Sequence, residues 1–76
     1  MVKLVTNAPT TLYRKLRARG SYSMVKTEIV LPAGTELQRK NPEHYPFERE
    51  LILFYKVMYM GTTHYIRVEE TSLGDN

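Results

Sequence analysis

The feature that most constrains this chain is a hairpin pattern in its second half. Residues 47–60, FERELILFYKVMYM, form the longest run typical of a β-strand, and residues 64–70, HYIRVEE, form a shorter one. Between them Gly61 is free to take the positive φ that a tight reversal needs. The return run alternates between two faces: His64, Ile66 and Val68 on one, and Tyr65, Arg67 and Glu69 on the other. This pattern predicts two antiparallel strands joined as a hairpin.

The first half of the chain carries further strand patterns. Residues 21–31, SYSMVKTEIVL, are rich in β-branched and aromatic residues, a Pro-Ala-Gly turn follows, and residues 35–40 continue as a strand. We expect a core-facing row on either side of that turn: Ile29, Leu31, Thr35 and Leu37. Residues 41–46, NPEHYP, contain two prolines and are expected to form a loop or a single helical turn rather than a central strand. The pattern predicts an all-β chain of about five short strands, closed into a small barrel that leaves no exposed edge.

Residues 10–20, TTLYRKLRARG, are ambiguous. As a helix, a threonine would cap the segment, Leu12 and Leu16 would share one face, and Gly20 would end it. As extended chain, Leu12, Arg14 and Leu16 would share a face, which is a poor alternation. The local pattern therefore favours one short helix near residues 10–19.

Size and composition limit the other possibilities. The 76 residues predict one domain, 1–76, with a loose tail at 74–76, and the absence of cysteine excludes disulfides and thiolate metal sites. We find no apolar run typical of a signal peptide or a membrane span, so we expect a cytoplasmic protein without membrane contact.

The charge of the chain is unevenly distributed. Residues 1–40 hold eight Lys/Arg and two Glu, a net +6, whereas residues 41–76 hold three Lys/Arg and six Asp/Glu, a net −3. This asymmetry fits a protein whose two ends attract each other, and it also fits a protein with an acidic partner.

Three segments in order resemble a known family. They are LRARGSYS (16–23), VLPAGTEL (30–37) and FYKVMYMGTTHYIRVEETSL (54–73). Together they are similar to the bacterial SH3-like domain family, with its Leu-x-x-Gly-Thr turn and its glycine-containing hairpin. The resemblance implies a single SH3-like barrel in which Leu16 and Ala18 pack inward and the neighbouring arginines point outward. Phe54 stands where the family usually has tryptophan, and His64 where it has glycine, so the resemblance extends to the fold and not to cell-wall peptide binding.

The sequence contains no pattern typical of an enzyme. Its two histidines, His44 and His64, are twenty residues apart and have no metal-ligand spacing. Glu48 and Glu50 flank Arg49 in a way that indicates a solvated strand entry rather than a pair of catalytic acids. We therefore expect no catalytic, metal or cofactor site.

Two sets of residues are candidates for binding a partner. The first is a basic cluster next to an aromatic residue: Arg14, Lys15, Arg17, Arg19 and Tyr22. The second is apolar: if the Tyr55 face of its strand is buried, Phe54 and Met58 point outward and offer a contact surface. In the alternative interpretation Tyr45 and Phe47 fold over that face and cover it.

These observations predict a non-catalytic protein-binding module whose partner has an acidic surface. Its small size suggests a regulator or inhibitor of a larger host complex, of the kind that phages encode. The competing predictions are a nucleic-acid-binding barrel that uses the cluster of residues 14–19, and a homo-oligomer formed through residues 51–60. The predicted partner-binding residues are Arg14, Lys15, Arg17, Arg19, Tyr22, Tyr45, Phe54 and Met58.

Overall fold

The computed structural model of the protein describes residues 2–70, which form seven strands and one short 3-10 helix. The elements are β1 (Val2–Val5), β2 (Thr10–Ala18), β3 (Ser21–Leu31), β4 (Glu36–Arg39), β5 (Glu43–Phe47), β6 (Glu50–Tyr59), β7 (Thr62–Arg67) and η1 (Val68–Glu70). All pairings are antiparallel, in the order β1-β4-β6-β7-β2-β3, and β5 pairs with the first half of β6. The all-β prediction is confirmed, and the predicted tail at 74–76 lies outside the described residues.

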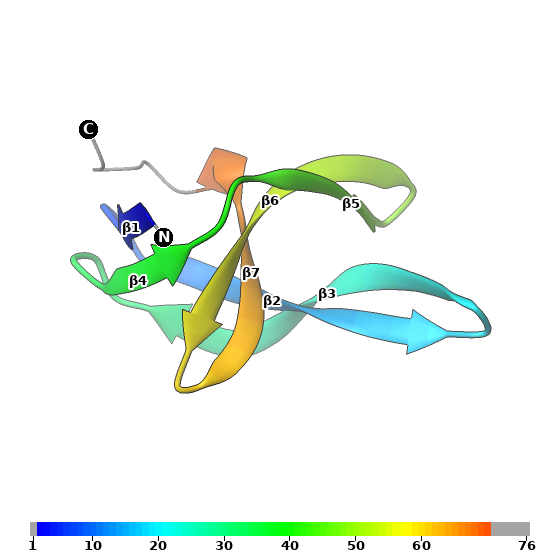
Figure 1. Cartoon of the computed structure of the whole chain (residues 1–76), viewed down its shortest axis with the longest axis horizontal. Coiled ribbons are helices and arrows are strands. Elements are labelled where there is room, and N and C mark those ends of the chain that lie inside the picture. The colour runs from blue at the N-terminus through cyan, green and yellow to red at the C-terminus, as the bar shows by residue number, and fades with distance from the viewer. Residues whose placement is uncertain (1, 71–76) are drawn as a thin grey trace.

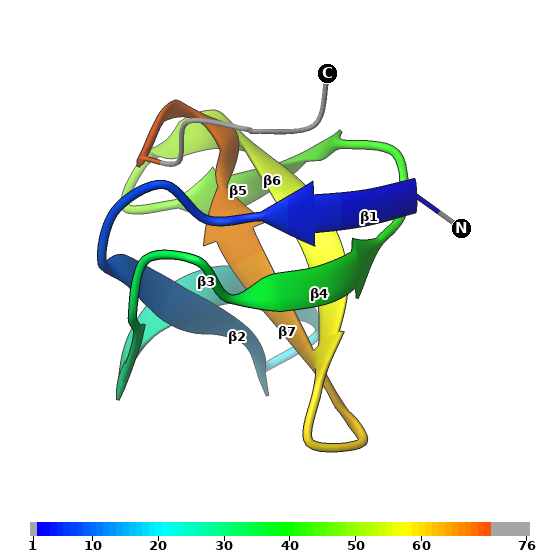
Figure 2. The same ribbon diagram turned by 90° about the vertical axis from the view of Figure 1, so that its left-hand side faces the viewer.

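The sheet is open, and it has seven strands where about five were expected (Figure 1). It curves around an interior when viewed along its long axis, with β1 and β4 in front (Figure 2). Its outermost strands, β1 and β3, do not pair with each other. Hydrogen bonds from one residue take the place of that ladder: the Thr6 hydroxyl donates to the Pro32 carbonyl (2.8 Å) and accepts from the Thr35 amide (3.0 Å). The end of β1 is thus tied to the β3–β4 turn without a closed barrel.

The segment expected to be helical is β2. Residues 10–18 pair with β3 along their length, and Tyr13 also pairs with Tyr65 of β7. The threonines and Tyr13 favour extended chain, and partners on two neighbouring strands outweigh a weak helical pattern. The helix prediction for residues 10–19 was therefore wrong.

The ladder between β2 and β3 contains a bulge. Its register with β3 shifts between Thr11 and Tyr13. The Thr27 hydroxyl donates to the Leu12 carbonyl (2.8 Å) and accepts from the Ile29 amide (3.1 Å), so this side chain replaces ladder bonds that the shift removes. On β2 itself the alternation is regular, so the neighbouring residues Leu12 and Tyr13 enter two different hydrophobic cores.

The two cores lie on opposite faces of β6, β7 and β2, because consecutive residues of a strand point to opposite faces. The first core contains Leu4, Leu12, Leu31, Leu37, Tyr55, Val57 and Ile66. The second core contains Tyr13, Met24, Tyr45, Phe54 and Tyr65, with Phe47 and Ile52 against it. Of the predicted row, Leu31 and Leu37 are confirmed and Ile29 packs partly buried against the first core, whereas Thr35 is half-buried and not part of it.

The cover of the second core is β5, which the sequence assigned to a loop. Residues 43–47 pair only with β6, so β5 is an edge strand that accommodates Pro46. Its Tyr45 and Phe47 rings lie 6.2 and 6.3 Å from the Phe54 ring. The alternative in which these residues cover that face is therefore the one observed.

Two hairpins extend from the body at the same end of the molecule, which measures 37 × 21 × 21 Å (Figure 1). We call residues 13–26 the β2–β3 arm and residues 43–54 the β5–β6 arm. The β2–β3 arm has five Lys/Arg and no Asp/Glu, whereas the β5–β6 arm has three Glu and one Arg. The arms therefore carry opposite charge.

Candidate partner-binding surface

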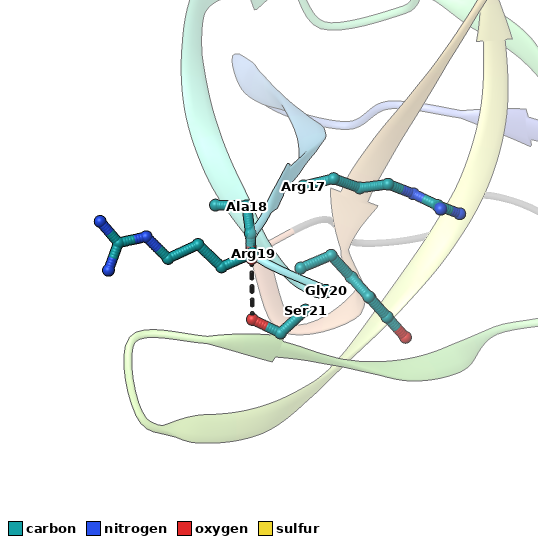
Figure 3. Close-up of a pocket in the computed structure, with 6 residues that line it drawn as sticks. Arg17, Ala18, Arg19, Gly20 and Ser21 are labelled. Atoms are coloured by element: carbon teal, nitrogen blue, oxygen red, sulfur yellow. Dashed lines mark hydrogen bonds between the residues drawn. The ribbon is translucent and has the colours of Figure 1, made fainter.

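The β2–β3 arm ends in a two-residue turn. Arg19 and Gly20 have φ values of 53° and 80°, as a type I′ turn requires, and the Ser21 hydroxyl donates to the Ala18 carbonyl (3.2 Å). Figure 3 shows that Arg17 and Arg19 extend to opposite sides of this turn. Within residues 2–70, none of the arm's five basic side chains forms an ion pair with a carboxylate. The attraction between the two ends of the chain therefore does not neutralise this arm.

The outer face of the arm continues the face that is buried in the first core. Leu12, Arg14 and Leu16 share this face, and Arg14 lies opposite Val25 of β3. Only Leu12 is covered, since the strand leaves the body after it, and Leu16 is 55% exposed. The expectation that Leu16 packs inward was therefore wrong. Arg14, Leu16 and Val25 are among the residues that line a depression on this face.

The inner face of the arm holds a lysine among three tyrosine rings. The Lys15 ammonium lies 4.8, 5.4 and 5.9 Å from the ring centroids of Tyr22, Tyr45 and Tyr65. The Tyr45 ring is 5.1 Å from Tyr65 and 6.3 Å from Tyr22, at steep angles to both. We call Tyr22, Tyr45 and Tyr65 the tyrosine cage. It is assembled from β3, β5 and β7, and its cation comes from β2.

Two phenols of the cage, those of Tyr45 and Tyr65, are held in their neutral form. Burial, followed by the hydrogen bond that the Tyr45 hydroxyl donates to Glu43 Oε1 (3.0 Å), raises the pKa of Tyr45 to about 12. Burial likewise raises the pKa of Tyr65, with the Tyr22 phenol and the Glu43 carboxylate contributing. The rings of Tyr45 and Tyr65 therefore attract the cation as neutral π-systems and not as phenolates.

The eight predicted partner-binding residues lie in five separate places. Arg14 lies on the outer face, Arg17 and Arg19 lie at the turn, and Lys15, Tyr22 and Tyr45 meet at the cage. Phe54 is fully buried in the second core, so its predicted outward position was wrong, because the opposite face of β6 has a core of its own.

Met58 is exposed but lies away from the arm. It pairs with Thr63 and Gln38 near the end of β6, which is at the opposite end of the long axis from the β2–β3 turn (Figure 1). Met60, in the β6–β7 turn, is exposed at the same end. Self-association through residues 51–60 stays a prediction.

Tyr65 is the site residue that the sequence did not reveal. Alternation placed Tyr65 on the other face of its strand from His64. The pairing of Tyr65 with Tyr13 of β2 is what brings it to the β2–β3 arm. That pairing joins residues about fifty positions apart, and the sequence has no local pattern that specifies it.

Comparison with known proteins identifies no relative: no family model, no curated protein and no solved structure matches the chain. Within residues 2–70, no helix is long and apolar enough to cross a membrane, and no three His, Asp or Glu side chains are grouped as metal ligands.

Proposed function

We propose that this protein is a non-catalytic binding module that binds an acidic protein surface through the outer face of its β2–β3 arm. The observation that carries the proposal is Leu16, an exposed apolar side chain on a protruding hairpin, next to Arg14 and Val25 in one depression. A protein interface has this composition, an apolar centre with charged residues, arginine above all, around it.

The electrostatics of the arm support an acidic partner. Five positive charges, none of them in an ion pair within residues 2–70, create a local positive potential, which speeds association with an acidic surface and disfavours a basic one. The role that we infer for a module of this size is regulation or inhibition of a larger complex. On the motifs of residues 16–73, we propose that the open sheet is a variant of the SH3-like barrel.

The test compares two matched variants, Leu16→Asp and Leu51→Asp. Both replace an exposed leucine of an arm, and Leu51 is the more exposed, at 69% against 55%. Each variant and the parent protein are used as bait in a nuclease-treated lysate, and the captured proteins are quantified by mass spectrometry. We expect a set of acidic proteins that the parent and Leu51→Asp retain and Leu16→Asp loses. Equal capture by both variants, or no specific capture by the parent, would contradict the proposal.

A second candidate function, nucleic-acid binding, is favoured by one specific observation. Arg17 and Arg19 extend to opposite sides of a two-stranded ribbon, and such a ribbon fits a DNA major groove with phosphates on both sides (Figure 3). A gel-shift titration of random-sequence duplex DNA at two salt concentrations tests it. Binding that weakens with salt, and weakens further in Arg17→Gln/Arg19→Gln, would support this function, whereas absence of binding at low salt would exclude it.

A further inference from the structure

The tyrosine cage lies on the opposite face of the arm from Leu16, so it is a separate feature from the surface proposed above. Its rings come from three strands that are far apart in the sequence, and they converge on one ammonium group. Tyr45 and Tyr65 are buried, whereas Tyr22 is 38% exposed and forms the solvent side. The geometry is an ammonium group that lies against two buried rings and one ring open to water.

The cage holds its cation by ring faces and not by a carboxylate. Within residues 2–70, Lys15 has no ion pair. The carboxylate that contacts the cage, Glu43, accepts a hydrogen bond from the Tyr45 hydroxyl. Cation–π attraction strengthens when the cation loses water, and a primary ammonium is strongly hydrated. An alkylated ammonium sheds water more readily and therefore suits such rings better than Lys15 does.

Lys15 is a replaceable occupant because of how it is attached. Its ammonium ends a four-carbon stem with several rotatable bonds, so keeping it in the cage restricts a side chain that has many other rotamers. Its backbone is on β2, opposite Met24 of β3, and stays in the ladder wherever the ammonium lies. The side chain can leave without any change of fold.

We propose that the tyrosine cage is a binding site for a trimethylammonium group, and that Lys15 occupies it as a built-in competitor. A ligand must displace Lys15, so the apparent affinity of the ligand is its intrinsic affinity multiplied by the fraction of time that the cage is free. Conversely, an acidic group that draws Lys15 outward vacates the cage. The two faces of the arm would then be coupled through one lysine.

The test uses tetramethylammonium chloride as the probe, followed by NMR at constant ionic strength. In the parent protein, we expect the Lys15 ε-protons to resonate upfield because of the three ring currents. They should move toward their ordinary position as the probe is added, while ammonium chloride has little effect. The proposal is overturned if these protons do not respond, or if ammonium and tetramethylammonium shift the same signals equally.

Measurements on variants make the test quantitative. If Lys15 fills the cage about nine-tenths of the time, Lys15→Ala should bind the probe about tenfold more tightly than the parent. Lys26→Ala is the matched control, a lysine of the same arm that is not over the cage, and it should bind as the parent does. Adding Tyr45→Leu to Lys15→Ala should abolish the gain. Unchanged affinity in Lys15→Ala would refute the proposal, and the parent titration decides the case if that variant does not fold.

Two sources could supply the trimethylammonium group, a methylated lysine side chain and a choline headgroup. Titration of Lys15→Ala with trimethyl-lysine amide and with phosphocholine separates them. Tighter binding of the first assigns the site to a modified protein, and tighter binding of the second assigns it to a choline ligand. Failure of both, with tetramethylammonium also unbound, overturns the proposal without bearing on the Leu16 surface.

Discussion

Replacing Thr6 by valine should test how an open sheet is held together. Thr6 is buried between the end of β1 and the β3–β4 turn, and valine has nearly the same shape without the hydroxyl. Two hydrogen bonds are lost, the one donated to Pro32 and the one accepted from the Thr35 amide. The main-chain bonds of Thr6, to the Thr35 carbonyl (3.0 Å) and from the Gly34 amide (2.7 Å), remain.

The magnitude follows from what each broken bond leaves behind. Each bond contributes about 1 kcal/mol net, and the Thr35 amide then lacks its partner at a further cost of about 1 kcal/mol. The Pro32 carbonyl keeps a donor, because the Thr35 hydroxyl also bonds to it at 2.6 Å. We therefore expect Thr6→Val to lower the free energy of unfolding by about 2–3 kcal/mol, and Tm by about 10–20 °C in a domain of this size.

Urea denaturation followed by tyrosine fluorescence measures the change, with Thr63→Val as the control. The Thr63 hydroxyl is near only the Met58 sulfur, at 3.7 Å, so its loss should change the free energy of unfolding by less than about 0.5 kcal/mol. A Thr6→Val variant as stable as Thr63→Val would refute the view that this hydroxyl links β1 to the turn.

Three further predictions concern the bulge, a turn and the cage. Thr27→Val should lower the free energy of unfolding by about 2 kcal/mol in urea, because it removes both bulge bonds, and an unchanged midpoint would contradict the role of Thr27. Arg49→Gly should raise the free energy of unfolding by about 1 kcal/mol, and Tm with it, because φ at this turn position is 123°. Arg49→Ala should give no such increase, and equal effects of the two variants would argue against backbone strain. Stability should fall above pH 10, because folding raises the pKa of Tyr45 to about 12. The native state therefore holds the phenol proton more tightly than the unfolded state does. This contribution to the free energy of unfolding is fully present below pH 10 and is lost as the pH rises through 12. Two pKa units correspond to about 2.7 kcal/mol, which solvent screening reduces to about 1 kcal/mol, and Tyr45→Phe should lose this part of the alkaline slope in urea titrations.

Alternation in the sequence predicted part of the first core but not the second. It separates the two faces of a strand, and it correctly placed Leu31 and Leu37 inward. It does not say whether the other face is also covered, which depends on β5 folding back over Phe54. An apolar residue on the second face therefore indicated an interface in the sequence and a core in the structure.

The candidate site was predicted in its residue types more than in its arrangement. The basic cluster and two of the cage tyrosines stood out because they are close in sequence or exposed in pattern. The helix favoured for residues 10–19 depended on the spacing of Leu12 and Leu16, which is equally the spacing of one strand face. Only the pairing of β2 with β7 decides which tyrosines meet Lys15, and such a pairing is set by the whole sheet.

The three two-residue turns have a consequence for how the chain folds. Each joins strands adjacent in the sequence, so the β2–β3, β5–β6 and β6–β7 hairpins close small loops and can form within microseconds. Pairing β1 with β4 and β2 with β7 must wait for distant segments to meet. We therefore expect a transition state in which the hairpins are formed and the strand-to-strand contacts between them are not. Substitutions at Thr6 should then accelerate unfolding and leave the folding rate almost unchanged.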